Sequence, residues 1–260
     1  MQIPFSKYQG TGNDFILIDN RKGEISLTNK QVAKFCHRRF GIGADGLMLV
    51  ENAEGFDFKM VYYNSDGNQS SMCGNGGRCI TKFAYDIGLH LDKYHFLAVD
   101  GPHDAWIDDK QTVYLKMKDV QDVEHHNGHD VLDTGSPHFV KHVQDLENVS
   151  VAVEGKQIRN QEKYKKQGIN VNFVEIIGED RIFVRTYERG VEDETYSCGT
   201  GVTASALVNA HNDFGFNHID VQTIGGKLFV EFDKIDDEHF ENIWLCGPAI
   251  KVFDGVLTVD

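Results

Sequence analysis

A cysteine followed by Gly-x-Gly occurs twice in this chain, and this repeat constrains the fold more than any other feature. Cys73 and Cys198 lie 125 positions apart, in CGNG and CGTG. Each motif follows an apolar strand-like segment and a polar loop, as in VYYNSDGNQSSMCGNGGRC and VRTYERGVEDETYSCGTGV. Each then leads into apolar residues at helical spacing. GNDF has a weaker echo in GSPHF. The repeat predicts two halves of one architecture, with the two cysteines on opposite walls of a cleft.

The pattern along the chain predicts an α/β protein. Helical spacing is expected in TNKQVAKFCHRRFG, with Thr28 as its cap and Gly41 as its end, and after each Cys-Gly-x-Gly motif. Alternating segments such as GLMLVE, FKMVYYN, INVNFVEII and RIFVRTYE read as strands. The polar, unpatterned residues 119–130 are predicted to link the halves, and the closing AIKVFDGVLTVD reads as a pair of strands.

Charge and composition exclude some classes of partner. The net charge is −14, with 40 acidic against 26 basic residues, so no basic excess exists to neutralise nucleic acid or an anionic membrane. No stretch approaches the roughly 20 apolar residues that span a bilayer, and MQIPFSKYQG lacks a secretory signature. These two features favour a cytoplasmic location. An odd count of five cysteines favours reduced thiols, with Cys36 and Cys246 expected in the core.

The two motif cysteines stand where helix N-termini would favour chemistry. Unpaired N–H groups and the helix dipole stabilise a thiolate, and the same groups bind carboxylates. Two such motifs offer a base and an acid on either side of one bound carboxylate. This arrangement suits removal of a proton beside the carboxylate on one face and delivery of a proton on the other.

Each of these residues has other interpretations when it is taken alone. A single cysteine in a glycine-rich loop is most often structural, so the functional interpretation depends on the pair of motifs. Cys73 with Cys79 has an atypical spacing for zinc, and His125, His126 and His129 fall in the predicted linker, so no metal site is expected. GTGND lacks both the Gly-Lys-Ser/Thr ending and the full GxGxxG pattern of phosphate-binding loops.

Five motifs, in order, resemble those of diaminopimelate epimerases: GTGNDF, NSDGNQSSMCGNGGRC, INVNF, YERG and SCGTG, with CGPAIKVFDG at the end. The resemblance implies two pseudo-symmetric lobes, each a sheet wrapped around a central helix, with the active-site cleft between them. The lobes would comprise residues 1–118 plus 249–260, carrying Cys73, and residues 119–248, carrying Cys198. The resemblance also implies an isomerase that interconverts LL- and meso-diaminopimelate for lysine and peptidoglycan synthesis, without pyridoxal phosphate or any other cofactor, and it implies a homodimer.

The resemblance also implies roles for individual residues. Cys73 and Cys198 correspond to the catalytic acid and base, and His138 resembles the partner of Cys73. The remaining positions correspond to substrate contacts: backbone N–H groups of Gly74, Asn75, Gly199 and Thr200; the amides of Asn13, Asn64 and Asn170; and Glu188 and Arg189 at the distal, non-reacting end. A guanidinium fits a carboxylate bidentately, and a carboxylate suits an ammonium group.

Three positions depart from the frequent family pattern. Ser136 replaces an Asn that contacts substrate, Gly46 stands where Gln is common, and Thr200 replaces a frequent Ser. Two other functions stay open at this point. A proline or hydroxyproline racemase would share the fold and the cysteine pair, but it resembles CGHG at the first motif and lacks a distal arginine. A thiol-based redox or binding protein would keep the fold without isomerase activity.

Overall fold

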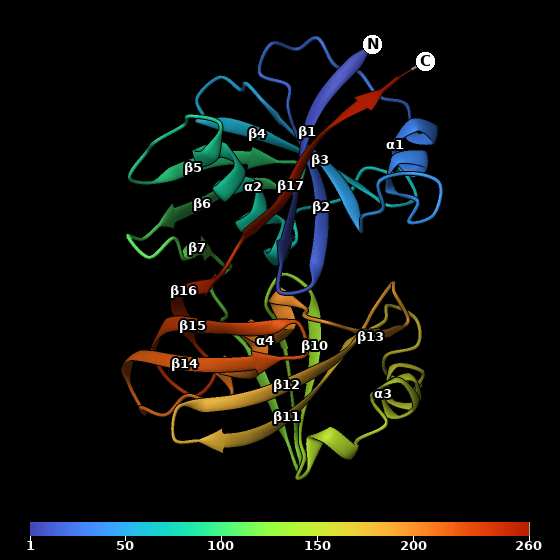
Figure 1. The fold of residues 1–260 in the computed structure, drawn as a ribbon. Helices are drawn as coiled ribbons and strands as arrows, with labels where there is room; N and C mark the ends of the chain where they lie inside the picture. The colour runs from blue at the N-terminus through green and yellow to red at the C-terminus, as the bar shows by residue number, and fades with distance from the viewer. Residues whose placement is uncertain (260) are drawn as a thin grey trace. The chain divides into compact units, whose positions relative to one another are not determined.

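The computed structural model describes residues 1–259, and the chain divides into two units, each with its own run of paired strands and its own helices (Figure 1). The first unit is Met1–Leu115 together with the chain from Pro248 onward, and the second is Lys116–Gly247. The sequence predicts boundaries after residues 118 and 248, whereas the contacts divide the chain after residues 115 and 247. Asp260 lies outside the described residues.

The strands of the first unit pair in the order β17-β1-β2-β3-β4-β5-β6-β7. The β2–β3 and β4–β5 pairs are parallel and the others are antiparallel. Two helices accompany this sheet, α1 between β2 and β3 and α2 between β4 and β5. The bounds are β1 Gln2–Gly10, β2 Asn13–Asp19, α1 Asn29–Cys36, β3 Gly46–Glu51, β4 Phe58–Asn64, α2 Gly74–Asp86, β5 Tyr94–Ala98, β6 Gly101–Ile107, β7 Val113–Lys116 and β17 Ile250–Thr258.

The second unit repeats this topology in the order β8-β9-β10-β11-β12-β14-β15-β16. Its parallel pairs, β10–β11 and β12–β14, occupy the same places in the order. The bounds are β8 Val123–His126, β9 His129–Asp133, β10 Pro137–His142, η1 Leu146–Asn148, α3 Val151–Arg159, β11 Asn170–Gly178, β12 Arg181–Glu188, β13 Asp193–Thr195, α4 Gly199–Leu207, β14 Gly215–Thr223, β15 Gly226–Lys234 and β16 Phe240–Gly247. The predicted internal repeat of an α/β architecture is therefore confirmed.

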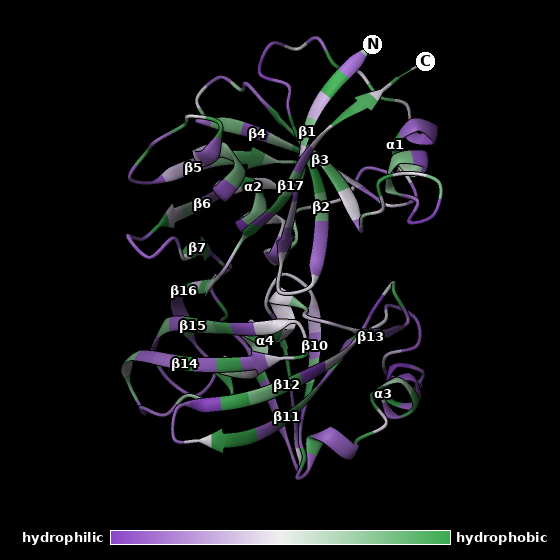
Figure 2. Cartoon of the chain, in the orientation of Figure 1, coloured by the Kyte–Doolittle hydropathy of each residue, from purple (hydrophilic) through white to green (hydrophobic). Residues whose placement is uncertain are grey.

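Helices α2 and α4 are the central helices of their units. α2 contacts β1, β2, β3 and β6, and α4 contacts β10, β11, β12, β14, β15 and β16. Every residue of α4 except Thr200 is buried, as are ten of the thirteen residues of α2. Around them, strands such as β14 alternate exposed and buried residues, and the ribbon changes between hydrophilic and hydrophobic colours accordingly (Figure 2). Each Cys-Gly-x-Gly motif thus begins a helix enclosed by sheet.

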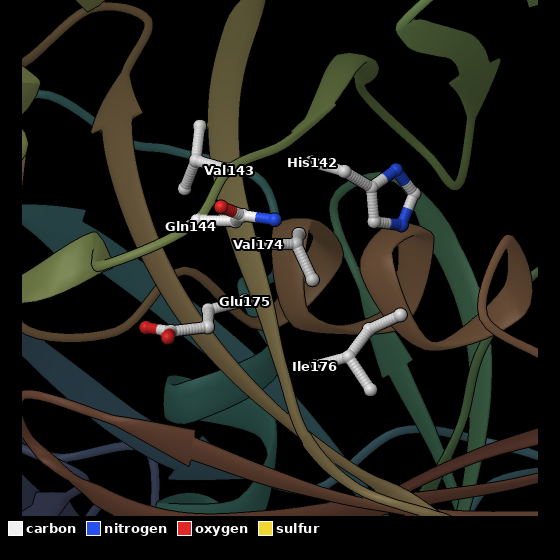
Figure 3. A pocket seen from close by; sticks show the side chains of 6 residues that line it. All are labelled: His142, Val143, Gln144, Val174, Glu175 and Ile176. Atoms are coloured by element: carbon white, nitrogen blue, oxygen red, sulfur yellow. The ribbon is translucent and has the colours of Figure 1, made fainter.

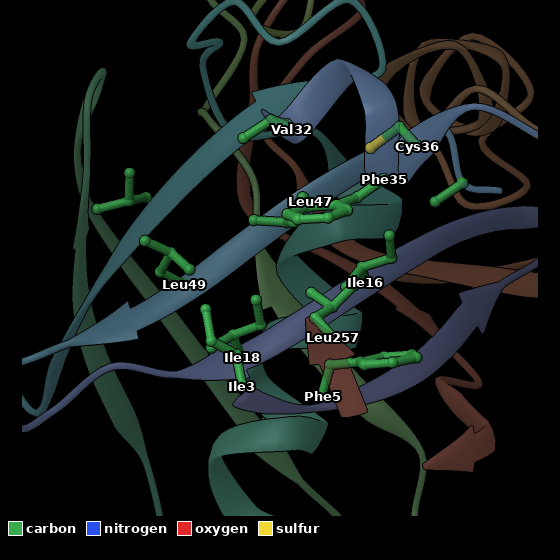
Figure 4. Close-up of a cluster of buried hydrophobic side chains, with 12 residues drawn as sticks. Ile3, Phe5, Ile16, Ile18, Val32, Phe35, Cys36, Leu47, Leu49 and Leu257 are labelled. Atoms are coloured by element: carbon green, nitrogen blue, oxygen red, sulfur yellow. The ribbon is translucent and has the colours of Figure 1, made fainter. Parts of the chain in front are cut away.

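A second apolar layer fixes the outer face of the first sheet against α1 (Figure 4). Val32 and Phe35 of α1 pack on side chains of β1, β2, β3 and β17, among them Ile16 and Leu47. Thr28 caps this helix through a capping box with Gln31. Each fully buried Leu, Ile or Phe contributes about 1.5–3 kcal/mol, so the helix is held mainly by its apolar face. Cys36 belongs to this layer and Cys246 is buried in β16, as predicted for both.

Two predicted segments are wrong. Residues 119–130 are not an unstructured linker, because β8 and β9 form a hairpin there. Its side chains are mostly exposed, so no alternation was visible, and the pairing of His125 with Asp130 at 2.7 Å helps to hold it. The closing segment is one strand, β17, and not a pair of strands. Gly255 lies against Phe5, where a Cβ would approach the ring to 2.5 Å, and the strand continues through this position along β1.

The helices also differ from expectation in extent. α1 ends at Cys36, five residues before the predicted stop at Gly41. α3 was not predicted, since Gly155 interrupts its sequence. That glycine is needed for packing, because a Cβ there would lie 2.3 Å from the Cβ of Tyr187. Among the described residues, no helix is long and apolar enough to cross a membrane.

Candidate active site

Cys73 is the N-cap residue of α2 in the first unit. Its backbone is extended, and its Sγ accepts a hydrogen bond from the Gly76 N–H at 3.3 Å. Gly76 has no room for a side chain without crowding this sulfur, since a Cβ would lie 3.1 Å from it. The thiol therefore lies over N–H groups that stabilise its anionic form. The residue as a whole is half-buried.

The predicted site residues of the first unit, called the first half-site, include two asparagines at one end of the two strands that flank β3. Asn13 begins β2 and Asn64 ends β4, and both strands pair with β3 near Gly46. The Asn13 Oδ1 atom is buried and has no hydrogen-bond partner within the described part of the chain. A Cβ at Gly46 would lie 2.5 Å from the Tyr62 ring, so a glutamine could not replace this glycine without moving that ring. The position of the Tyr62 ring thus explains why this chain has glycine at position 46, where Gln was noted as common.

Cys198 is the N-cap residue of α4 in the second unit and is buried. Its Sγ lies 3.5 Å from the hydroxyl oxygen of Thr200, a contact that the more frequent serine could also make. The backbone of α4 approaches β11 closely, because a Cβ on Gly201 would lie 2.2 Å from Asn172 Oδ1. Glycine at this position therefore lets the start of the helix seat directly on the sheet.

His138 is fully buried beneath this helix. Its Nδ1 accepts a hydrogen bond from the Asn172 amide at 3.1 Å, which places the proton of a neutral ring on Nε2. Burial, reinforced by the charge of Arg189, lowers the pKa of His138 to about 3. The Nε2 atom is buried and has no partner among residues 1–259. The ring is therefore neutral, and its Nε2–H group donates no hydrogen bond to the described residues.

Three predicted site residues of the second unit, Ser136, Asn170 and Arg189, form one hydrogen-bonded cluster, and Glu188 precedes Arg189 in the chain. Ser136 Oγ accepts from Asn170 Nδ2 at 2.9 Å and from Arg189 Nη2 at 3.1 Å. Asn170 also donates to the carbonyl of Pro137 and accepts the Arg189 backbone N–H at 2.8 Å. Glu188 accepts the Thr195 hydroxyl at 2.9 Å. The serine thus takes an internal place in the cluster and orients the guanidinium.

Sequence reasoning missed two threonines that connect the hairpin turns to the central helices. The hydroxyl of Thr11 donates to Asn75 Oδ1 at 3.3 Å, and that of Thr134 donates to the Thr200 carbonyl at 2.9 Å. Asn75 and Thr200 both stand two residues after their cysteine. The sequence contained a signal for both threonines, because a threonine directly precedes each of the two similar segments GNDF and GSPHF.

A hollow at the far end of β10 and β11 contains none of the predicted site residues (Figure 3). Two of its polar side chains make hydrogen bonds within the fold. Glu175 accepts the backbone N–H groups of Asp145 and Leu146, and His142 pairs with Asn209 at 3.0 Å. Within residues 1–259, no group of three or more His, Cys, Asp or Glu side chains is arranged to hold a metal ion.

Solved structures share this fold at low sequence identity. A PhzF-family phenazine biosynthesis protein of Bacillus anthracis superposes with a TM-score of 0.73 at 13% identity, over 100% of both chains. A probable proline racemase of Agrobacterium radiobacter gives 0.66 at 14% identity, over 99% of this chain and 93% of that one. These similarities establish the fold alone.

Sequence comparisons identify the family. The family model described as diaminopimelate epimerase matches residues 5–123 and 131–252. A diaminopimelate epimerase of Flavobacterium psychrophilum is 50% identical over 250 residues, covering 95% of this chain and 97% of the relative. One of Chlorobaculum tepidum is 43% identical over 260 residues, covering 96% and 99%. The chain, with a Cys-Gly-x-Gly motif at the head of each central helix, belongs to the diaminopimelate epimerase family.

Proposed function

We propose that this isomerase interconverts LL- and meso-diaminopimelate by two-base proton transfer at one α-carbon, without a cofactor. The observation that carries the proposal is the equivalent position of Cys73 and Cys198. Each is the N-cap of the central helix in a unit of the same topology. Family membership supports the substrate and favours this reaction over a proline racemase or a non-catalytic thiol protein.

The proposed reaction conserves protons over one turnover. One cysteine enters as a thiolate and removes the α-proton, while the other enters as a thiol and delivers its proton to the opposite face. The thiolate thereby becomes a thiol and the thiol a thiolate, so the roles exchange with direction. The backbone N–H groups of Gly74, Asn75, Gly199 and Thr200 would bind the reacting carboxylate. They would stabilise the negative charge that develops on its oxygens.

The state of His138 supports its proposed role as the partner of Cys73. Its ring is neutral, and its buried Nε2–H has no acceptor among the described residues. We propose that this donor faces the Cys73 sulfur in the working enzyme, and that Glu188 lies beside Cys198. The Nε2–H group of a neutral imidazole can donate a hydrogen bond that stabilises the thiolate, without a permanent positive charge in the site.

The distal cluster provides the proposed contacts to the second amino-acid end. Arg189 would bind the distal carboxylate, and Glu188 the ammonium group. Ser136 already accepts two hydrogen bonds, so its O–H proton remains to be donated to the substrate. The side-chain amide of Asn170 donates its two hydrogen bonds to Ser136 Oγ and the Pro137 carbonyl. We therefore propose that Asn170 mainly orients this cluster, while Asn13 and Asn64 contact the substrate directly.

Cysteine replacement tests the proposal. Cys73→Ala and Cys198→Ala should each lower epimerisation of LL-diaminopimelate by roughly a thousandfold or more, because either change removes one of the two bases. The matched control is Cys36→Ala, a buried cysteine of the outer apolar layer, which should retain activity. Undiminished turnover by either site variant would refute the assignment. Racemisation of proline in place of diaminopimelate would favour the rival enzyme.

We also propose that the protein forms a homodimer through β17. Ile250, Val252 and Val256 of this strand are each at least half exposed, and a bulge in its pairing with β1 falls at Val252. Exposed apolar side chains gathered on one edge strand are typical of an interface. Light scattering should give twice the chain mass of 29.3 kDa. Val256→Lys should give the monomer, while Val153→Lys on α3, of similar exposure, should not. A monomeric wild-type protein would contradict this.

A cytoplasmic location is part of the same proposal. The chemistry requires one thiol and one thiolate, and reducing compartments keep cysteines in these forms.

A further inference from the structure

Arg78 is a buried cation that the proposed chemistry has not used. It stands five residues after Cys73 in α2, and its side chain is 0% exposed. Arginine is almost never fully buried unless its hydrogen-bonding groups are satisfied by specific partners. Its contacts therefore indicate what the residue does.

The guanidinium connects two segments that are distant in sequence. Nη2 donates to Asn75 Oδ1 at 2.9 Å and to Thr11 Oγ1 at 3.2 Å, while Nη1 donates to the Gly74 carbonyl at 3.3 Å. Gly74 and Asn75 form the first turn of α2, directly after Cys73. Thr11 lies in the turn between β1 and β2, two residues before Asn13. One side chain thus holds both segments of the first half-site.

The backbone at Thr11 supports a dedicated role for this contact. Its φ is +50°, and that of Gly12 is +88°. Such turns favour Asn-Gly or Gly-Gly, and a β-branched residue at positive φ is an outlier. Thr11 uses its hydroxyl to accept from Arg78 and to donate to Asn75 at 3.3 Å. This contact explains why a strained threonine occupies the turn.

The second unit provides a natural comparison. Thr134 makes the corresponding turn-to-helix contact with Thr200. The position five residues after Cys198 is Thr203, whose hydroxyl bonds the Gly199 carbonyl at 3.0 Å. The two helices therefore share their glycine-rich start, but only α2 has a buried arginine in this place.

We propose that Arg78 is a positioning residue specific to the Cys73 half-site. Its guanidinium fixes the first turn of α2 to the Thr11–Gly12 turn. This holds the N–H groups that stabilise the Cys73 thiolate in register with Asn13, and it adds positive charge near that helix terminus. The inference rests on the proposed catalytic use of Cys73.

Cysteine labelling tests the inference without relying on turnover. Wild-type protein and variants would react with iodoacetamide at one fixed pH, and mass spectrometry would give the rate for each cysteine-containing peptide. Arg78→Met should slow labelling of Cys73 by about tenfold, because the thiolate is the reactive form, and should change Cys198 by less than about twofold. Arg78→Lys should give an intermediate rate, since lysine keeps the positive charge but lacks the planar guanidinium that donates to several acceptors at once. Thr203→Val should leave Cys73 unchanged.

A second pair of variants keeps the inference testable if Arg78→Met unfolds the protein. If Arg78→Met exposes the core cysteines Cys36 and Cys246 to labelling, Thr11→Val and Thr11→Ser decide instead. The valine variant should slow Cys73, and the serine variant should restore the wild-type rate. No change at Cys73, or equal changes at Cys73 and Cys198, would overturn the inference. Failure of the proposed function would appear separately, as undiminished epimerisation by Cys73→Ala.

Discussion

Gly67→Ala is expected to damage the first half-site through a loop that does not contain either cysteine. Gly67 has φ of +87°, and a Cβ there would lie 2.0 Å from the Asn29 carbonyl oxygen at the start of α1. The loop is also bound to the end of β4. Gly67 donates to the Asn64 carbonyl at 2.9 Å, and the Asn64 N–H donates to the Asn68 carbonyl at 2.9 Å. A displaced Gly67 must therefore displace Asn64.

The size of the effect follows from this geometry. Ordinary contact begins at 3.4 Å, so the loop must move by about 1.4 Å from the 2.0 Å approach. The left-handed backbone conformation costs an alanine about 1–2 kcal/mol, and forced contact adds about 1–3 kcal/mol. A misplacement of about 1 Å in a substrate-positioning residue can lower the rate by about 100-fold. We expect a loss of roughly 2–5 kcal/mol in unfolding free energy and a fall of about 100-fold in kcat/KM.

The matched control is Gly55→Ala. Gly55 has φ of +81° in the same unit, but a Cβ added there would meet no atom within 4 Å beyond its two chain neighbours. It should therefore show only the backbone cost of about 1–2 kcal/mol and keep wild-type kcat/KM. Urea denaturation would give the stabilities, and NMR would follow epimerisation. If Gly67→Ala matched Gly55→Ala in both quantities, the argument from the Asn29 contact would be refuted.

Three further outcomes follow from the second unit. Ser136→Ala should raise KM for diaminopimelate by about tenfold through loss of an acceptor for Arg189, and unchanged binding would exclude an orienting role. The pKa of His138 is about 3 when folded and 6.5 ordinarily. The unfolded chain therefore binds the extra proton first, and stability should fall by up to about 1.4 kcal/mol per pH unit as pH drops from 6.5 toward 3. Urea titrations of His138→Gln should show a shallower slope than wild type, and equal slopes would contradict this. Gly201→Ala should lower kcat by about tenfold or more by pushing α4 off Asn172, and wild-type kinetics would argue against close seating of the helix.

The fold was largely predictable because its strongest signal is a repeat. Two Cys-Gly-x-Gly motifs, each preceded by a strand and followed by helical spacing, indicated equivalent units, and the pairing order of the two sheets agrees. Elements without periodic burial were missed. The β8–β9 hairpin exposes most of its side chains, and α3 contains a glycine that only its contact with Tyr187 explains.

The candidate site was less predictable wherever its residues act on each other. Cys73 and Cys198 carry a local sequence signal, because a helix N-cap is readable from the chain. Arg78 does not, since an arginine in an amphipathic helix normally indicates a solvated face. Only the structure shows it buried against Thr11. The double acceptor role of Ser136 likewise depends on side chains from three separate segments.

The most direct test of the central claim is isotope incorporation from deuterated water. LL-diaminopimelate would be incubated with the enzyme in D₂O, and NMR would follow the α-positions of substrate and product at early times. If two thiols act on opposite faces, deuterium should enter the inverted centre of the meso product, while unreacted LL substrate stays essentially unlabelled. Deuterium appearing in recovered LL substrate as fast as in product would indicate a single base and contradict the account.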